Sequence, residues 1–235
     1  MEALQLSLDE METLKKYRVT FDVCLDKTEA VPVEMFLKED FLRGYLEQIK
    51  GNLNAPSTLV CASLFSKRYA YLVAVPALYT LSVLNKKLNM DTENLMILHK
   101  ENEALWLPEI SFRHYQFNDF EGEKDREAYR KDLIRTLFAN HMNIIWNHLA
   151  SISKVSRQTL WENTCIYVYW LYESLIKEIK CEATVERLRG DFKFLLIEAD
   201  GKLFGKYNKN VLARFYHAKT QVDDKEIRVR KTCCF

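Results

Sequence analysis

The fold is decided by residues 57–84, which read STLVCASLFSKRYAYLVAVPALYTLSVL. This stretch is apolar on most of its faces, which is typical of a helix surrounded by other elements of the fold. Pro76 lies inside it and predicts a kink or a break, because proline has no backbone N–H to donate and its ring clashes with the preceding turn. We therefore expect a long, interrupted helix at the centre of the molecule.

Four further helices are predicted around this centre from apolar residues at helical spacing: over 38–50, over 123–151, after Ser156 and over 184–197. The pattern over 123–151 is the clearest. Near the N-terminus, Ser7 and Glu10 form the capping-box pattern that begins a helix, here one that runs to about Tyr17. Helices therefore dominate the predicted elements.

Strands are predicted only in short pieces. Residues 95–99 and 104–107 flank the polar and charged residues 100–103, an arrangement typical of a β-hairpin. Further strands are predicted over 17–25, 110–117 and 227–230. The predicted fold class is α+β, predominantly α-helical with a small antiparallel sheet or hairpin.

The chain has 235 residues, 48% of them hydrophobic, which is enough for one large domain with a real core. With 6 glycines and 4 prolines, long flexible linkers are not expected. We predict a single domain over 1–235. Two lobes remain an alternative, with a boundary near the polar and acidic stretch 117–127. A C-terminal tail begins at about residue 228.

The composition argues against several classes of protein. The net charge is +1, from 34 basic and 33 acidic residues, so overall charge does not favour binding to nucleic acid or to an anionic membrane. No glycine-rich phosphate loop is present. The N-terminus lacks the basic-then-apolar pattern of a secretory signal, and the longest apolar stretch, residues 70–84, is too short and mixed for a transmembrane segment. A cytoplasmic location is predicted.

The cysteines indicate metal or redox chemistry near the C-terminus, where Cys233 and Cys234 are adjacent. Neighbouring Cα atoms lie ~3.8 Å apart, whereas a relaxed disulfide needs ~5.5–6 Å, so this pair favours a soft ligand over a bond to itself. Flanking cations favour the thiolate form. A terminal pair without function is the alternative. Four isolated cysteines are predicted to be buried and reduced: Cys24, Cys61, Cys165 and Cys181.

Six cations are candidates for binding an anion: Lys67, Arg68, Arg113, Lys206, Lys209 and Arg214. Lys67 and Arg68 interrupt an apolar helix, which indicates either an anion site in a pocket or a helix edge that reaches the surface. The cations near Gly205 form either an anion patch or a solvated loop. His141 and His148 share a helix face and could approach one site, but a pair of histidines lacks the third ligand that a metal needs.

Residues 230–235, RKTCCF, resemble the C-terminal signature of FhuF-type ferric siderophore reductases. Further segments are similar to the same family and occur in order: SLFSKRYA at 63–70, LWEN at 160–163, YWLYE at 169–173, DFKFLL at 191–196 and LFG at 203–205. The resemblance covers most of the chain from about Leu59 onward. Each segment is modest, and their order together with the terminal Thr-Cys-Cys makes the match specific.

The resemblance implies a bacterial, cytoplasmic oxidoreductase that reduces Fe(III) in an imported siderophore and releases Fe(II). In this family an adjacent cysteine pair and a following Cys-x-x-Cys hold a [2Fe–2S] cluster. Cys233 and Cys234 match the first pair and are thereby implied as cofactor-binding metal ligands. The second pair has no counterpart before Phe235, so we expect either a truncated chain or a lost cluster.

The implied partners are a ferric siderophore, of hydroxamate or citrate type, and an electron-donor protein or other reductant. The six candidate cations would then contact the substrate. One alternative is a non-catalytic module that binds a siderophore or a partner, related to the C-terminal region of siderophore synthetases, with the cluster absent. Another is a structural protein that completes a zinc site with a second copy of the chain.

Overall fold

The computed structural model of the chain describes residues 6–21, 28–100, 106, 108–223 and 225–232. Its α-helices are α1 (Leu8–Lys16), α2 (Glu39–Ile49), α3 (Thr58–Tyr79), α4 (Glu123–Leu137), α5 (Asn143–Ser153), α6 (Arg157–Glu178) and α7 (Glu182–Lys193). Its strands are β1 (Thr28–Pro32), β2 (Lys87–Leu88), β3 (Leu95–Lys100), β4 (Glu109–Phe112), β5 (Phe117–Asn118), β6 (Thr220–Val222) and β7 (Lys225–Ile227). The predicted class, predominantly helical α+β with small antiparallel sheets, is confirmed.

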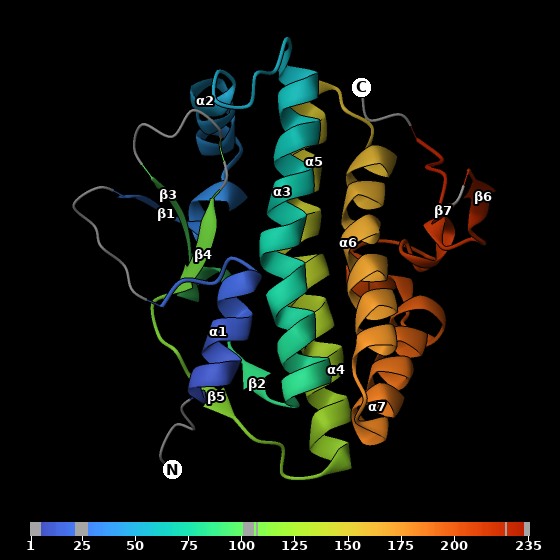
Figure 1. The fold of residues 1–235 in the computed structure, drawn as a ribbon. Coiled ribbons are helices and arrows are strands. Elements are labelled where there is room, and N and C mark those ends of the chain that lie inside the picture. The colour runs from blue at the N-terminus through green and yellow to red at the C-terminus, as the bar shows by residue number, and fades with distance from the viewer. Residues whose placement is uncertain (1–5, 22–27, 101–105, 107, 224, 233–235) are drawn as a thin grey trace.

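Helices α3 and α6 run side by side through the centre, with α5 behind α3 and α7 beside α6 (Figure 1). The sheet, α1 and α2 lie on the other side of α3, and the β6–β7 hairpin lies beyond α6 (Figure 1). Buried side chains from the helices and the main sheet join in one apolar cluster. The single domain and the lobe boundary near 117–127 stay predictions.

The central helix α3 follows the sequence pattern closely. Ser57 caps its N-terminus by accepting a hydrogen bond from the backbone N–H of Val60. The helix does not break at Pro76; it continues to Tyr79 and then widens into a π-helical turn, η3 (Thr80–Leu84). No helix in the described parts of the chain has the length and apolar character needed to cross a membrane.

The other helices also form where their patterns predict them. Two contain a π-helical turn: η5 (Phe138–Met142) joins α4 to α5, and η6 (Phe194–Glu198) extends α7. Ser156 caps α6, and the capping box between Ser7 and Glu10 begins α1. Four 3₁₀ segments complete the described helical structure: η2 (Val33–Leu37), η4 (Thr92–Asn94), η7 (Gly201–Phe204) and η8 (Ala213–Phe215).

The main sheet has the antiparallel order β1-β3-β4, in which Ile97 lies opposite both Val31 and Ile110. The predicted pairing of residues 95–99 with 104–107 is wrong, because β3 pairs with β4. Within 104–107 only Trp106 is described, and its side chain is fully buried while its backbone N–H donates to Asn52. Core packing of this indole therefore replaces strand pairing.

Two other strand predictions need correction. In the described part of 17–25, only Val19 forms a bridge, to Ile110, and residues 22–25 lie outside the described residues. In 227–230, Ile227 ends β7 and the chain then leaves the hairpin. The physical reason is that residues 228–232 bind side chains of α6 and do not pair with a strand.

Candidate functional site

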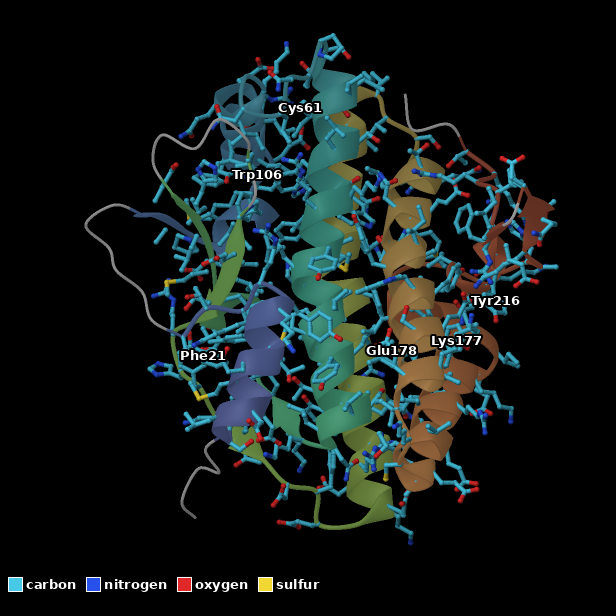
Figure 2. The ribbon with its side chains drawn as sticks, in the orientation of Figure 1. Phe21, Cys61, Trp106, Lys177, Glu178 and Tyr216 are labelled. Atoms are coloured by element: carbon cyan, nitrogen blue, oxygen red, sulfur yellow. The ribbon has the colours of Figure 1, made fainter. Side chains whose placement is uncertain are left out.

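Residues 228–232, which we call the tail, lie against α6. Arg228 donates to Glu173 Oε1 at 2.7 Å, and Lys219 lies 2.6 Å from the other oxygen of the same carboxylate. The Arg228 guanidinium also lies over the rings of Tyr169 and Tyr216, at 5.0 and 4.6 Å from their centroids. Tyr216 is on the outer side of α6 (Figure 2). The first residue of the tail is therefore clamped by charge and by aromatic contact.

Arg230 connects the tail to both central helices. Its guanidinium donates to Asn163 Oδ1 at 2.7 Å. The amide nitrogen of Asn163 in turn donates to the backbone oxygen of Ser63 at 3.1 Å and to Ser66 Oγ at 2.9 Å. Asn163 is completely buried, so this polar chain occupies the α3–α6 contact and positions the tail relative to both helices.

Glu162 holds the end of the described tail. Its carboxylate accepts hydrogen bonds from the backbone N–H of Lys231 at 2.6 Å, from that of Thr232 at 2.8 Å, and from the Thr232 hydroxyl. The residue is only 4% exposed. Burial alone would raise the pKa of Glu162, but the hydrogen bonds from Thr232 and Lys231 and the charge of Arg230 together lower it. Thr232, which directly precedes the cysteine pair, is thus fixed on α6.

A cavity of about 920 Å³ opens beside this anchor. It is lined by residues of the N-terminal turns of α6, of η6 and of the segment before and within η8: Ser156, Arg157, Gln158, Trp161, Leu196, Ile197, Tyr207, Asn208, Lys209, Asn210, Val211, Ala213, Arg214 and Phe215. We call it the cationic pocket. Trp161, in its wall, is the chain neighbour of Glu162, so pocket and tail share one turn of α6.

The wall of the pocket is held by specific contacts. Trp161 Nε1 donates to the Tyr207 hydroxyl at 3.0 Å, which donates to Asn143 Oδ1 at 3.0 Å. Gly205 has φ +131°, and a Cβ there would lie 2.6 Å from the Asn143 side chain. A Cβ on Gly201 would lie 2.5 Å from the backbone oxygen of Tyr207. Only glycine allows these close approaches, so the two glycines shape the loop that carries Tyr207.

The loop is also tied from its far side. Asn210 Nδ2 donates to the backbone oxygens of Leu195 at 2.7 Å and Ala199 at 3.2 Å, and its Oδ1 accepts from the N–H of Leu212 at 2.9 Å. An amide that satisfies donors and acceptors on both sides fixes the loop against η6. The described lining of the pocket therefore comes from residues 156–215 and includes no cysteine.

The charged side chains among the described residues that line the pocket are all positive. Arg157, Lys209 and Arg214 contribute to its wall, and no aspartate or glutamate is among the described lining residues. Lys231, in the tail, adds a fourth cation beside the pocket, because its ammonium donates to the backbone oxygen of Arg214 at 3.0 Å. Such a lining favours an anionic ligand.

Comparison with known protein families shows which family the chain belongs to. Residues 63–220, about two thirds of the sequence, match the family described as ferric iron reductase FhuF-like transporter. The chain belongs to the FhuF-like ferric iron reductase family. No curated protein matches it. The predicted family is confirmed over residues 63–220, which include Glu162 and the whole described lining of the cationic pocket and end before residues 230–235.

The structure brings only two of the six candidate cations together, Lys209 and Arg214, which line the cationic pocket. Lys206 is exposed on the same loop but is not part of the described lining. Arg113 is exposed and lies 3.5 Å from Glu34.

The remaining two cations, Lys67 and Arg68, lie on a half-buried edge of α3. Arg68 lines a separate cavity of about 220 Å³ and donates to the backbone oxygen of Trp106. Trp106 lies between α2 and α3, on the side of α3 away from α6 (Figure 2). Burial and the charge of Arg18 both lower the pKa of Arg68, with burial the larger cause and the charge of Tyr167 opposing them.

Sequence reasoning missed Arg157, Trp161 and Glu162. Glu162 carried a usable signal, because a carboxylate inside an otherwise apolar helix needs a partner. Trp161 lies in LWEN at 160–163, a segment that resembles the family, but nothing in that segment marks it as a pocket residue. Arg157 carried no signal, because it meets the segment at 207–215 only through the tertiary fold.

The described cysteines do not form a cluster site. Cys61 and Cys165 are buried as predicted, and burial raises their pKa values to about 11 and about 12. Cys181 is exposed, contrary to the prediction, because it sits at the N-cap of α7, where hydrogen bonds from Thr184 lower its pKa.

In the part of the chain that the structure describes, no three His, Cys, Asp or Glu residues gather as metal ligands. The described residues therefore do not fit a [2Fe–2S] cluster by themselves. Cys24, Cys233 and Cys234 lie outside the described residues.

The two histidines of the long helix have separate environments. His141 lies in η5, completely buried, with Nε2 2.7 Å from the Tyr69 hydroxyl. Burial lowers the pKa of His141 to about 3, so it stays neutral. His148 follows after the π-helical turn, and the described residues supply no third ligand for a shared metal site.

Proposed function

We propose that this FhuF-like protein reduces Fe(III) in a ferric siderophore and releases Fe(II) in the cytoplasm. The family match supports an iron reductase. One observation carries the finer proposal. Glu162 binds the residue before the cysteine pair, and its neighbour Trp161 lines a pocket of about 920 Å³. Because ligand pockets typically measure ~300–1,000 Å³, this cavity has the right size for a siderophore.

Reduction is an effective way to release siderophore iron. Fe(III) is a small, hard ion that binds hydroxamate and carboxylate oxygens strongly, whereas Fe(II) is larger and softer and matches them poorly. One electron added to the complex therefore converts a tightly held ion into one that exchanges. The substrates proposed are hydroxamate or citrate complexes, and the electron comes from a donor protein or another one-electron reductant.

The residues of this chain have three parts in the proposed reaction. The cationic pocket binds and orients the ferric complex, and its aromatic wall, Trp161, Tyr207 and Phe215, excludes water from one side of it. Glu162 positions the tail beside that wall. Cys233 and Cys234 are proposed as two ligands of a [2Fe–2S] cluster, which when bound supplies single electrons at a potential set by hydrogen bonds and exposure.

The proposal is tested on anaerobically purified protein. We expect production of Fe(II) from a ferric siderophore with dithionite as donor. About two irons and two acid-labile sulfides per chain would establish a [2Fe–2S] cluster whose other two ligands are not Cys233 and Cys234. The matched variant is Cys233→Ser with Cys234→Ser, and the control is Cys181→Ser, since Cys181 is exposed on α7. Reduction that is equally fast in the terminal double variant would rule out the cysteine pair.

A second candidate is a binding module without reductase activity. It is favoured by the fact that residues 156–215 build the pocket without any described cysteine in its lining. Colourless protein that binds a ferric siderophore but does not reduce it would support this function over the first.

A further inference from the structure

The cationic pocket differs from the rest of the molecule in how its charges are balanced. Arg157 donates to the neutral Asn147 side chain at 3.3 Å, and the Arg214 guanidinium lies 5.8 Å from the Phe215 ring. Within the described residues, no ion pair joins either arginine, or Lys209, to a carboxylate. Three cations thus face one cavity without an anion from the described protein.

The same cavity offers apolar surface to a ligand. Leu196 and Ile197 line it from η6, and the Ile197 side chain is 73% exposed. When an apolar part of a ligand covers a large exposed aliphatic side chain, burial of that apolar surface stabilises the complex. The complementary ligand therefore has an organic body as well as negative charge.

We propose that this pocket selects ferric chelates with net negative charge, such as those formed by carboxylate-bearing siderophores, over neutral or cationic chelates of similar size. The proposal rests on the proposed function and names its substrate class. Arg157 and Arg214 present planar guanidinium groups that match carboxylates, and Lys209 adds a point charge. The three side chains are specificity-determining residues in this proposal.

The charge of the pocket also acts on the reaction itself. When a bound anionic chelate accepts one electron from the donor, Fe(III) becomes Fe(II), no bond to the protein forms or breaks, and the complex gains one negative charge. Cations around it then stabilise the reduced complex more than the oxidised one. The lining that selects the substrate therefore also favours its reduction.

Binding of gallium chelates tests the proposal without any need for a cluster. Ga(III) replaces Fe(III) with the same charge but is not reduced, so calorimetry measures binding alone. The probes are Ga(III) citrate as an anionic chelate, a neutral cyclic trihydroxamate complex, and a cationic linear trihydroxamate complex with a free amine. We expect the anionic chelate to bind on the order of tenfold more tightly than the cationic one, the sum of several exposed ion pairs.

The matched variants are Lys209→Glu with Arg214→Glu in the pocket and Lys124→Glu as control. All three side chains are exposed, so the fold should persist, which thermal unfolding verifies. Lys124 lies in the first turn of α4, outside the described pocket lining. We expect the double variant to lose about tenfold in affinity for the anionic chelate and none for the cationic one, and the control to bind as the wild type does.

The outcomes separate this inference from the proposed function. If neutral and cationic chelates bind the wild type as tightly as the anionic one, or if the double variant weakens all three equally, charge selection is wrong while siderophore binding stands. If none of the three chelates binds, both proposals fail.

Discussion

The tail and the cationic pocket meet on the same turn of α6, yet they differ in whether their arginines have a carboxylate partner. In the tail, Arg228 is paired with Glu173, and Arg230 lies 3.6 Å from the Glu162 carboxylate. In the pocket, the cations have no described carboxylate partner. A paired, half-buried cation fixes structure, whereas one without a partner at a cavity is available to a ligand. The comparison predicts which substitutions affect stability and which affect binding.

The largest effect is expected where charges are paired in the interior. Asp191 is 1% exposed and lies 2.6 Å from Arg126 and 3.1 Å from Arg130. Asp191→Ala leaves the buried Arg126 and the half-buried Arg130 without their anion, which we expect to cost ~3–5 kcal/mol in free energy of unfolding. Chemical denaturation measures this loss. The control is Asp132→Ala, which removes an exposed carboxylate 3.9 Å from Arg135 and should change stability by less than ~1 kcal/mol. Similar losses in both variants would contradict the distinction between interior and exposed ion pairs.

A smaller, local effect is expected at the tail. Glu162→Ala removes the acceptor of the Lys231 and Thr232 backbone N–H groups, which should favour opening of the tail by ~1–3 kcal/mol. Hydrogen exchange at these two amides reports the opening directly. Glu162→Gln keeps one acceptor oxygen and should lose less. Unchanged protection of both amides in Glu162→Ala would show that the carboxylate does not anchor the tail.

Acid should release the same contacts. The folded-state pKa values of Glu162 and Glu173 are lowered from their ordinary value of 4.5, since hydrogen bonds and nearby cations outweigh the burial that opposes them. Their stabilisation is therefore present above pH 4.5 and is lost as the pH falls through the lowered values. We expect the protection of the Thr232 amide, measured relative to its intrinsic exchange rate at each pH, to fall below about pH 4.5 in the wild type. Glu162→Gln should remove the part of this pH dependence that is due to Glu162. If Glu162→Gln keeps the full wild-type pH profile, another group causes the loss of protection.

The long helices could be predicted because their information is local. Ser57 and Ser156 cap α3 and α6. The apolar spacing of residues 123–151 predicts a helix there, although it does not reveal the π-helical turn η5 within it. Strand pairing is not local. The run 95–99 formed its predicted strand, but it pairs with β1 and β4, and Trp106 of its predicted partner segment is buried in the core.

The site was predictable only in part, for the same reason. Lys209 and Arg214 could be singled out because they are cations in and after a turn-rich loop. Their partner Arg157 lies on α6, and only the tertiary fold brings the two segments to one cavity. Glu162 could have been found from its charge, whereas its partner Thr232 could not, since 70 residues separate them in sequence.

The smallest effect on stability is expected in the cationic pocket, and this prediction completes the comparison. Lys209→Ala and Arg214→Ala remove exposed cations that have no described carboxylate partner, so each should change the free energy of unfolding by less than ~0.5 kcal/mol. Denaturation measures this alongside Ga(III) citrate affinity, which should fall by a few fold in each variant, the weight of a single exposed ion pair. Arg228→Ala is the matched tail variant, because it breaks the contact with Glu173. It should destabilise the tail without lowering the affinity for Ga(III) citrate. If Arg228→Ala weakens chelate binding as much as Lys209→Ala while stability is equal in both, paired and unpaired cations do not have separate roles in this protein.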